Sequence, residues 1–158
     1  MPAKPEPHNR RRRSTRTAPA ASVPDPSLVP QAHALVQAAL RVRAHACAPY
    51  SRFRVGAALL TRNGQIYTGV NIESASFGLT CCAERVALFK ALSEGAQDFV
   101  AIAIVAPIHG GPNPCGACRQ LLAEYAPGAL VWTADSRRPR RIRQWSIGDL
   151  LPEAFLRF

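Results

Sequence analysis

Apolar residues recur along this chain with two different periods, and the changes of period divide it into helices and strands. The first repeat has helical spacing and comprises Ala32, Leu35, Val36, Ala39 and Leu40. Residues 55–60 and 65–72 are instead strand-like, and they flank an Asn63-Gly64 pair, the strongest short signal for a hairpin turn. The pattern therefore predicts a helix that ends before Pro49, followed by a β-hairpin.

The second half of the chain alternates between the same two periods. Residues 99–106 are almost wholly apolar, which is typical of a strand covered on both faces. The other predicted elements are helices at 82–93, 116–125 and 147–151 and strands at 130–134 and 141–145. Gly95 and the Pro127-Gly128 pair are placed to end the first two of these helices. This order of elements predicts an α/β fold, with one three-layer α/β/α domain built on a five-stranded mixed sheet.

The first 27 residues differ in composition from the rest of the chain. They are rich in Pro, Ala, Ser and Arg and poor in large apolar side chains, and their prolines prevent a continuous helix. We therefore expect residues 1–27 to form a disordered, Arg/Pro-rich tail and residues 28–158 to form the folded domain.

Composition and charge narrow the class of protein. With 158 residues, 47% of them hydrophobic, the chain can form one domain with its own core. It has no apolar stretch long enough to cross a bilayer, so we expect no membrane association. The formal net charge of +10 raises nucleic acid as a partner. The charge is concentrated in residues 1–30 and 137–143, without the interleaved aromatic residues of a base-stacking surface, so nucleic acid is disfavoured.

The five cysteines point to a metal. Their odd number and the Cys115-x-x-Cys118 spacing fit metal binding in a reducing compartment, and hence a cytoplasmic protein, better than a disulfide framework. Cys82, Cys115 and Cys118 all fall at predicted helix N-termini, where the helix dipole and free backbone N–H groups favour thiolates. Two such helices aimed at one point would hold a single tetrahedral zinc ion. Cys47 is expected to be a small buried residue rather than a ligand.

An alternative is a closed structural site in which Cys81 supplies a fourth sulfur. Closed sites usually present paired C-x-x-C knuckles, whereas Cys81 and Cys82 are adjacent and would point about 100° apart on a helix. The closed site also leaves Glu84 without a role. We therefore favour an open site with three cysteine ligands and a fourth position for water.

Two neighbours of Cys82 are candidates for the chemistry at that position. Glu84 is the expected general acid and base, since one carboxylate can move a proton from water to substrate and then to the leaving group. Zinc with three thiolates has a formal charge of −1 and is a poor Lewis acid unless negative charge is withdrawn. Arg85 would do this by donating hydrogen bonds to the cysteine sulfurs.

These residues carry a family resemblance. Cys82-Ala83-Glu84-Arg85 and Pro114-Cys115-Gly116-Ala117-Cys118 resemble the two zinc motifs of the small, homotetrameric, zinc-dependent cytidine deaminases. Three further segments are similar to the family's first-strand motif, its sugar-binding segment and its C-terminal motif; they are residues 50–59, 71–80 and 150–155. The resemblance implies a cytidine-deaminase-like catalytic domain with one zinc ion per subunit, a nucleoside substrate and a homotetramer.

The resemblance also implies roles for individual residues. Asn71 and Glu73 match the family residues that bind the sugar, mainly its 3′-hydroxyl, and Phe53 matches one that lines the base pocket. Ala83 would contact the base through its backbone. Phe155 would reach into the site of a neighbouring subunit. Ala75 and Phe77, in the sugar-binding segment, are the remaining expected substrate contacts.

The implied reaction is the hydrolytic deamination of cytidine and 2′-deoxycytidine in pyrimidine salvage. A carboxylate at Glu73 that accepts a bond from a free 3′-hydroxyl would repel a 3′-phosphodiester, which favours free nucleosides over DNA or RNA. Two alternatives stay open from the residues. One is a deaminase of another substrate, either nucleic acid or an aminonucleoside antibiotic. The other is a non-catalytic, zinc-stabilised module that binds polyanions through its arginines.

Overall fold

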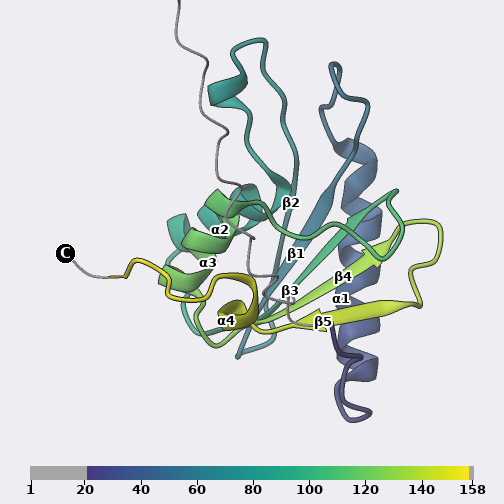
Figure 1. Ribbon diagram of the computed structural model, residues 1–158, viewed down its shortest axis with the longest axis vertical. Coiled ribbons are helices and arrows are strands. Elements are labelled where there is room, and N and C mark those ends of the chain that lie inside the picture. Colours follow the sequence, from purple (N-terminus) through teal and green to yellow (C-terminus); the bar gives the residue numbers. More distant parts are fainter. Residues whose placement is uncertain (1–20, 157–158) are drawn as a thin grey trace, which may run out of the picture.

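The computed structural model describes residues 21–156 as one α/β domain (Figure 1). Its nine main elements follow in chain order as α1 (Val29–Val42), β1 (Gly56–Thr61), β2 (Ile66–Val70), α2 (Ala83–Ser93), β3 (Phe99–Ala106), α3 (Gly116–Tyr125), β4 (Leu130–Asp135), β5 (Ile142–Trp145) and α4 (Ile147–Leu150). Two short 3₁₀ helices, η1 (Arg43–His45) and η2 (Phe77–Leu79), lie in the connections. The predicted elements therefore agree with the structure to within one or two residues at most ends.

The five strands form one mixed sheet in the order β2-β1-β3-β4-β5. The pair β3–β4 is parallel, and the pairs β1–β2, β1–β3 and β4–β5 are antiparallel. This confirms the predicted five-stranded mixed sheet. The β1–β2 hairpin also forms, and its turn closes with Gly64 N–H donating to the Thr61 carbonyl at 3.0 Å. Gly64 has a φ of +88°, so the glycine of the Asn-Gly pair takes the left-handed position in the turn.

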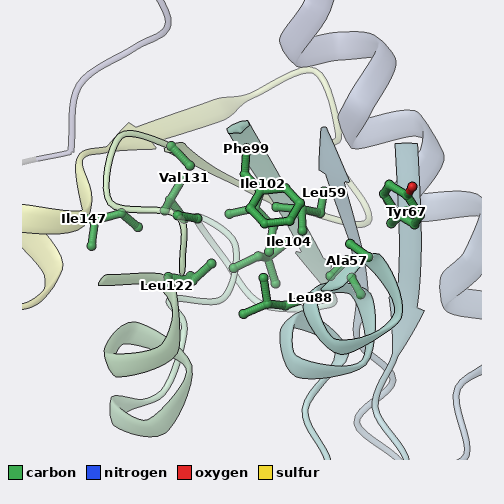
Figure 2. Packing of buried hydrophobic residues seen from close by; sticks show 14 of the residues in the cluster. Ala57, Leu59, Tyr67, Leu88, Phe99, Ile102, Ile104, Leu122, Val131 and Ile147 are labelled. Atoms are coloured by element: carbon green, nitrogen blue, oxygen red, sulfur yellow. The ribbon is translucent and has the colours of Figure 1, made fainter. Parts of the chain in front are cut away.

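Helices cover both faces of the sheet, which makes three layers (Figure 1). Helix α1 packs on one face, and its apolar stripe contacts alternate residues of β1, β3 and β4 in a cluster that includes Trp132. Helices α2, α3 and α4 lie on the other face and enclose the second cluster, part of which is shown in Figure 2. There Leu88 from α2 and Leu122 from α3 point toward Ile102 and Ile104 of β3. The predicted burial of β3 on both faces is confirmed, because seven of its eight residues are buried.

Helix α2 is fixed at both ends by glycines. At its C-terminus, Gly95 has a φ of +78°, donates to the Leu92 carbonyl at 3.0 Å, and is followed by Ala96, which donates to Ala91 at 2.9 Å. This is a Schellman motif, and it confirms that Gly95 ends the helix. At the other end, Gly69 of β2 lies so close to the helix that an added Cβ would be 2.4 Å from the Ala83 carbonyl oxygen. The absence of a side chain at Gly69 therefore determines how closely the first turn of α2 packs on strand β2.

The outer edge of the sheet is partly covered by the residues that precede α1. Ser22 and Gln144 of β5 exchange two backbone hydrogen bonds, of 3.0 and 2.7 Å. Ser22, which belongs to the predicted disordered tail, is thus hydrogen-bonded to β5, whereas residues 1–20 of that tail lie outside the described residues. Within residues 21–156, the helices are too short or too polar to cross a bilayer.

Candidate active site

Three cysteine side chains meet where helices α2 and α3 begin. Cys82 is the N-cap of α2 and Cys115 is the N-cap of α3, both with extended backbone, and Cys118 lies in the first turn of α3. Both helices pack on the same face of the sheet, and their N-termini converge, which places the positive ends of two helix dipoles near the sulfurs. The sequence placed all three cysteines at helix N-termini, and the structure brings them together.

The spacing of the three sulfurs fits one zinc ion. Cys115 Sγ lies 3.7 Å from Cys82 Sγ and 3.6 Å from Cys118 Sγ, and the three atoms all lie within 4.8 Å of one another. In a tetrahedral site with Zn–S bonds of about 2.3 Å, the sulfurs are about 3.8 Å apart. Among the described residues, Cys81 does not join this group; its backbone pairs with Ile72 instead. The arrangement therefore fits an open site with three protein ligands, and within residues 21–156 Cys81 is not grouped with them as a fourth sulfur.

The environment of the sulfurs favours a thiolate before any metal binds. The pKa of Cys82 is lowered to about 5, first because the Cys118 thiol donates a hydrogen bond to it and then because Arg85 does so. The same shared proton raises the pKa of Cys118. Thiolates are the form that binds zinc, and binding releases the protons that remain.

Glu84 lies beside this cluster in the first turn of α2 and is only 6% exposed. Removal from water raises its pKa to about 7, and the negative charge of Cys82 contributes in the same direction. A carboxyl group with a pKa near neutrality is suited to both accepting and donating a proton. Its position within the metal site therefore matches the role expected for a general acid and base.

Arg85 connects the cysteines to the neighbouring loop. Its Nη2 donates to the Thr80 carbonyl at 2.7 Å and to Cys82 Sγ at 3.8 Å. The predicted hydrogen bond from the guanidinium to a cysteine sulfur is therefore present, to one of the three sulfurs. The Nε of Arg85 is buried and has no partner within residues 21–156, so the group retains a further donor beside the site.

Glu73 lies in a second cluster, against the segment that leads into β1. Its carboxylate accepts from Tyr50 N–H at 2.9 Å, from Ser51 N–H at 3.1 Å and from the Ser51 hydroxyl. These bonds, the hydroxyl's first, hold the pKa of Glu73 below its ordinary value. The carboxylate lines a hollow of about 430 Å³ together with Phe77 and Thr80. Arg85 donates hydrogen bonds to both the Thr80 carbonyl and Cys82 Sγ, so the hollow that Thr80 lines is adjacent to the cysteine cluster.

Asn71 is buried and holds the segment before β1 in place. Its Oδ1 accepts from Val55 N–H at 2.8 Å, and its Nδ2 donates to the Phe53 carbonyl at 2.9 Å. Phe53 itself is 37% exposed. The structure thus brings Asn71 and Phe53 together through the backbone, and it gives Asn71 a structural task that the sequence did not reveal.

The remaining candidates are divided between buried and exposed positions. Ala83 is fully buried beside Cys82, whereas Ala75 is exposed and Phe77 is 80% exposed. Phe155 is 65% exposed, and its carbonyl accepts from Gln120 of α3 at 2.6 Å. The two phenylalanines present apolar surface outside the three-cysteine group.

One expectation about the cysteines was wrong, and one contact was missed. Cys47 is exposed, not buried, and its backbone pairs with Asn71 and Glu73. Ser51 was not singled out, although its side chain and backbone both bind Glu73. The two residues are 22 positions apart, and no periodicity links them.

Comparison with known proteins places this geometry among zinc-dependent deaminases. Residues 29–134 match a family model described as the cytidine and deoxycytidylate deaminase zinc-binding region. A cytidine deaminase of Halalkalibacterium halodurans is 50% identical over 122 residues, covering 77% of this chain and 91% of the relative. One from Sporosarcina psychrophila is 44% identical over 122 residues, covering 77% and 88%. The crystal structure of cytidine deaminase from Burkholderia pseudomallei superposes with a TM-score of 0.74 and 49% identity, covering 78% of this chain and 98% of that one.

Proposed function

Because the chain belongs to the cytidine and deoxycytidylate deaminase family, we propose that it hydrolyses cytidine and 2′-deoxycytidine to uridine and 2′-deoxyuridine, with release of ammonia. The observation that carries the proposal is the group of three sulfurs spaced for one tetrahedral ion, with a buried carboxyl beside them. We assign the protein to pyrimidine salvage on the same ground.

Cys82, Cys115 and Cys118 would hold one zinc ion per subunit. When bound, zinc supplies a Lewis acid that makes water nucleophilic at neutral pH. The two helix N-termini and Arg85 offset the negative charge of the three thiolates, with the Arg85 guanidinium 3.8 Å from Cys82 Sγ. This support keeps the site electrophilic despite its sulfur ligands.

Glu84 is assigned to the proton transfers. Its carboxylate takes a proton from the attacking water and delivers it to N3 of the cytosine ring as C4 gains the oxygen. It then takes the remaining proton from the new C4 hydroxyl and gives it to the departing amino group as the C4–N bond breaks and the C4 carbonyl forms, so one water is consumed and one ammonia is released. Burial excludes bulk water from this carboxyl group and raises its pKa to about 7. At neutral pH the group can therefore both accept and donate a proton.

Glu73 is assigned to the sugar. An ionised carboxylate has about four lone-pair positions, and three of them already accept bonds from Tyr50 and Ser51. One position on Oε1 is left for a hydroxyl donor, which fits the 3′-hydroxyl of a free nucleoside. A phosphodiester at the same place would bring its own negative charge against the carboxylate. Asn71 retains one donor and one acceptor for the same hydroxyl.

The remaining candidate residues are assigned to binding of the cytosine base and to contacts between subunits. Phe53, Ala75, Phe77 and the Ala83 backbone would complete the substrate pocket. We propose a homotetramer in which Phe155 of one subunit enters the site of another. The exposure of Phe155 and of Phe77, at 65% and 80%, supports this, because in an isolated subunit both residues present large apolar surface to solvent.

Turnover of cytidine by the zinc-loaded, full-length chain tests the proposal, with the ultraviolet change on conversion of cytosine to uracil as readout. Glu84→Gln should retain zinc and lose about 10²–10⁴-fold in kcat, the usual contribution of a positioned acid–base group. Cys82→Ala should lose zinc. Glu94→Gln, an exposed carboxylate at the end of the same helix, is the matched control and should keep full activity.

Two results would overturn this assignment. One is the absence of turnover with both cytidine and 2′-deoxycytidine while zinc is bound in stoichiometric amount. The other is turnover of a cytosine-containing oligonucleotide or an aminonucleoside antibiotic in place of the free nucleosides. Full activity of Glu84→Gln would refute the role of this carboxyl while leaving the substrate assignment intact.

A further inference from the structure

The arginine cluster of residues 137–143 has no part in the deaminase site, yet it borders a large hollow of its own. A cavity of about 590 Å³ lies between the segment before α1, helix α1 and the loop that joins β4 to β5. Arg138, Arg140, Arg141 and Arg143 line it, whereas none of the three cysteines does. Cavities of about 300–1,000 Å³ are typical of small-molecule sites.

Hydrogen bonds fold the β4–β5 loop so that its arginines face one space. Asp135 ends β4, its carboxylate accepts from Arg137 N–H at 3.0 Å, and its carbonyl accepts from Arg138 N–H at 2.8 Å. The next turn closes when Arg141 N–H donates to the Arg138 carbonyl at 3.0 Å. Two successive turns therefore hold the cationic side chains close together in spite of their repulsion.

The charge of this cavity is not neutralised within residues 21–156. No ion pair is formed there by the four arginines, and Asp135 is the one carboxylate that contributes to the lining. Asp135 is buried, at 7% exposure, and its Oδ1 is engaged by the loop backbone. A cavity whose four guanidinium groups form no ion pair with any described residue is suited to an anion with several oxygens, since guanidinium binds phosphate in a bidentate manner.

Arg143 is already positioned for such a ligand. Its guanidinium lies over the Trp145 ring, 4.8 Å from the centroid. It also lies against Gly110, where an added Cβ would be 2.8 Å from Arg143 Nη1. A side chain that is held in place before binding loses less conformational entropy when it binds.

Part of the cavity wall is apolar. Val23 and Pro24 come from the segment tied to β5, Val29 comes from the start of α1, and Ile142 comes from β5. Val23 is 77% exposed, which leaves an aliphatic surface unpaired beside the arginines. Inorganic phosphate alone would not use this wall, whereas a planar base or a sugar would.

We propose that this cavity is a second ligand site, which binds a phosphorylated nucleoside with its phosphates on the arginines and its nucleoside part on the apolar wall. The proposal goes beyond the deaminase function and does not depend on catalysis. The two sites differ in charge, because Glu73 disfavours a phosphate where the arginines of the cavity attract it. A free nucleoside would therefore bind at the deaminase site, and its phosphorylated form would bind in the arginine-lined cavity.

Equilibrium binding by calorimetry tests the proposal with the zinc-loaded, full-length protein at physiological salt. The probes are adenosine 5′-triphosphate, inorganic tripolyphosphate, adenosine and a single-stranded oligonucleotide without cytosine. Probes without cytosine are used because the proposed deaminase site takes a cytosine base, so that binding there does not contribute to the measurement. Adenosine 5′-triphosphate should bind at least about tenfold more tightly than tripolyphosphate, and adenosine should bind weakest. Arg140→Ala/Arg141→Ala should weaken the nucleotide by at least about tenfold.

The matched control removes two positive charges elsewhere. Arg62 in the β1–β2 turn and Lys90 in α2 are both exposed and do not line the cavity, so Arg62→Ala/Lys90→Ala should bind the nucleotide as tightly as the unaltered protein. Four results would each overturn the proposal. They are equal affinity for nucleotide and tripolyphosphate, equal loss in the two double variants, no binding, and a single-stranded oligonucleotide that binds at least about tenfold more tightly than the nucleotide.

Discussion

Replacing Gly69 by alanine tests whether β2 sets the position of helix α2, which carries Glu84. Gly69 has no side chain, and the backbone of α2 fills the space where one would be. An added Cβ would lie 2.4 Å from both the Ala83 carbonyl oxygen and the Ala87 nitrogen. Ordinary contact begins at 3.4 Å, so the first turn of α2 must retreat by about 1 Å.

The size of the expected effect follows from what this turn carries. Cys82 caps the helix and Glu84 lies in its first turn, whereas Cys115 and Cys118 belong to α3 and stay where they are. A shift of about 1 Å between ligands and acid–base group is enough to cost about 10²-fold in rate. Overpacking of the buried contact should also lower the free energy of unfolding by about 1–3 kcal/mol.

The assay measures kcat/KM for cytidine, bound zinc and the free energy of unfolding in denaturant for each variant. Gly128→Ala is the control, because an added Cβ there meets nothing within 4 Å. We expect Gly69→Ala to lose activity beyond its loss of stability, and Gly128→Ala to resemble the unaltered protein. Unchanged kcat/KM and zinc content in Gly69→Ala would refute the argument that strand β2 positions the site.

Three further predictions concern single contacts. Arg85→Gln removes the donor to Cys82 Sγ, so zinc affinity in a chelator competition should fall about 10–100-fold; unchanged affinity would exclude a tuning role. Ser51→Ala removes the leading cause of the lowered pKa of Glu73, so this pKa should rise. Because the carboxylate is then lost at a higher pH on acidification, KM for cytidine should begin to increase at a higher pH than in the unaltered protein, and coincident KM–pH profiles would contradict the assignment. Gly95→Ala forces a φ of +78° on alanine and should cost about 1 kcal/mol in chemical denaturation, with kcat retained.

The metal site could be predicted from the sequence because its geometry is local. Cys115 and Cys118 are one helical turn apart, and Cys82, Glu84 and Arg85 lie within four consecutive positions. Once each segment is expected to begin a helix, the ligand positions relative to that helix follow from its period. The single step that needed the fold was the convergence of the two N-termini on one face of the sheet.

The contacts that sequence reasoning missed join segments distant in the chain. The bonds from Ser51 to Glu73 and from Asn71 to Phe53 depend on how the loop before β1 lies over the end of β2. Cys47 belongs to the same loop, and its backbone pairs with Asn71 and Glu73 beyond the end of β2. The cavity lined by Arg138, Arg140, Arg141 and Arg143 also depends on distant segments, because other residues of its lining lie more than a hundred positions earlier. Tertiary packing, which periodicity does not encode, decides all of these.

The two backbone bonds between Ser22 and Gln144 have a consequence for self-association. β5 is the last strand of the sheet, and a bare edge strand offers unpaired N–H and C=O groups to the strands of other molecules. Here the outward-facing groups of Gln144 are already used within the chain, and the Gln144 side chain accepts from Trp132 Nε1 at 2.8 Å. The pairing of Ser22 with Gln144 therefore protects this part of the β5 edge from edge-to-edge aggregation. A chain shortened to begin at Leu28 would lose this protection of the β5 edge, although it would keep every residue of the proposed zinc site.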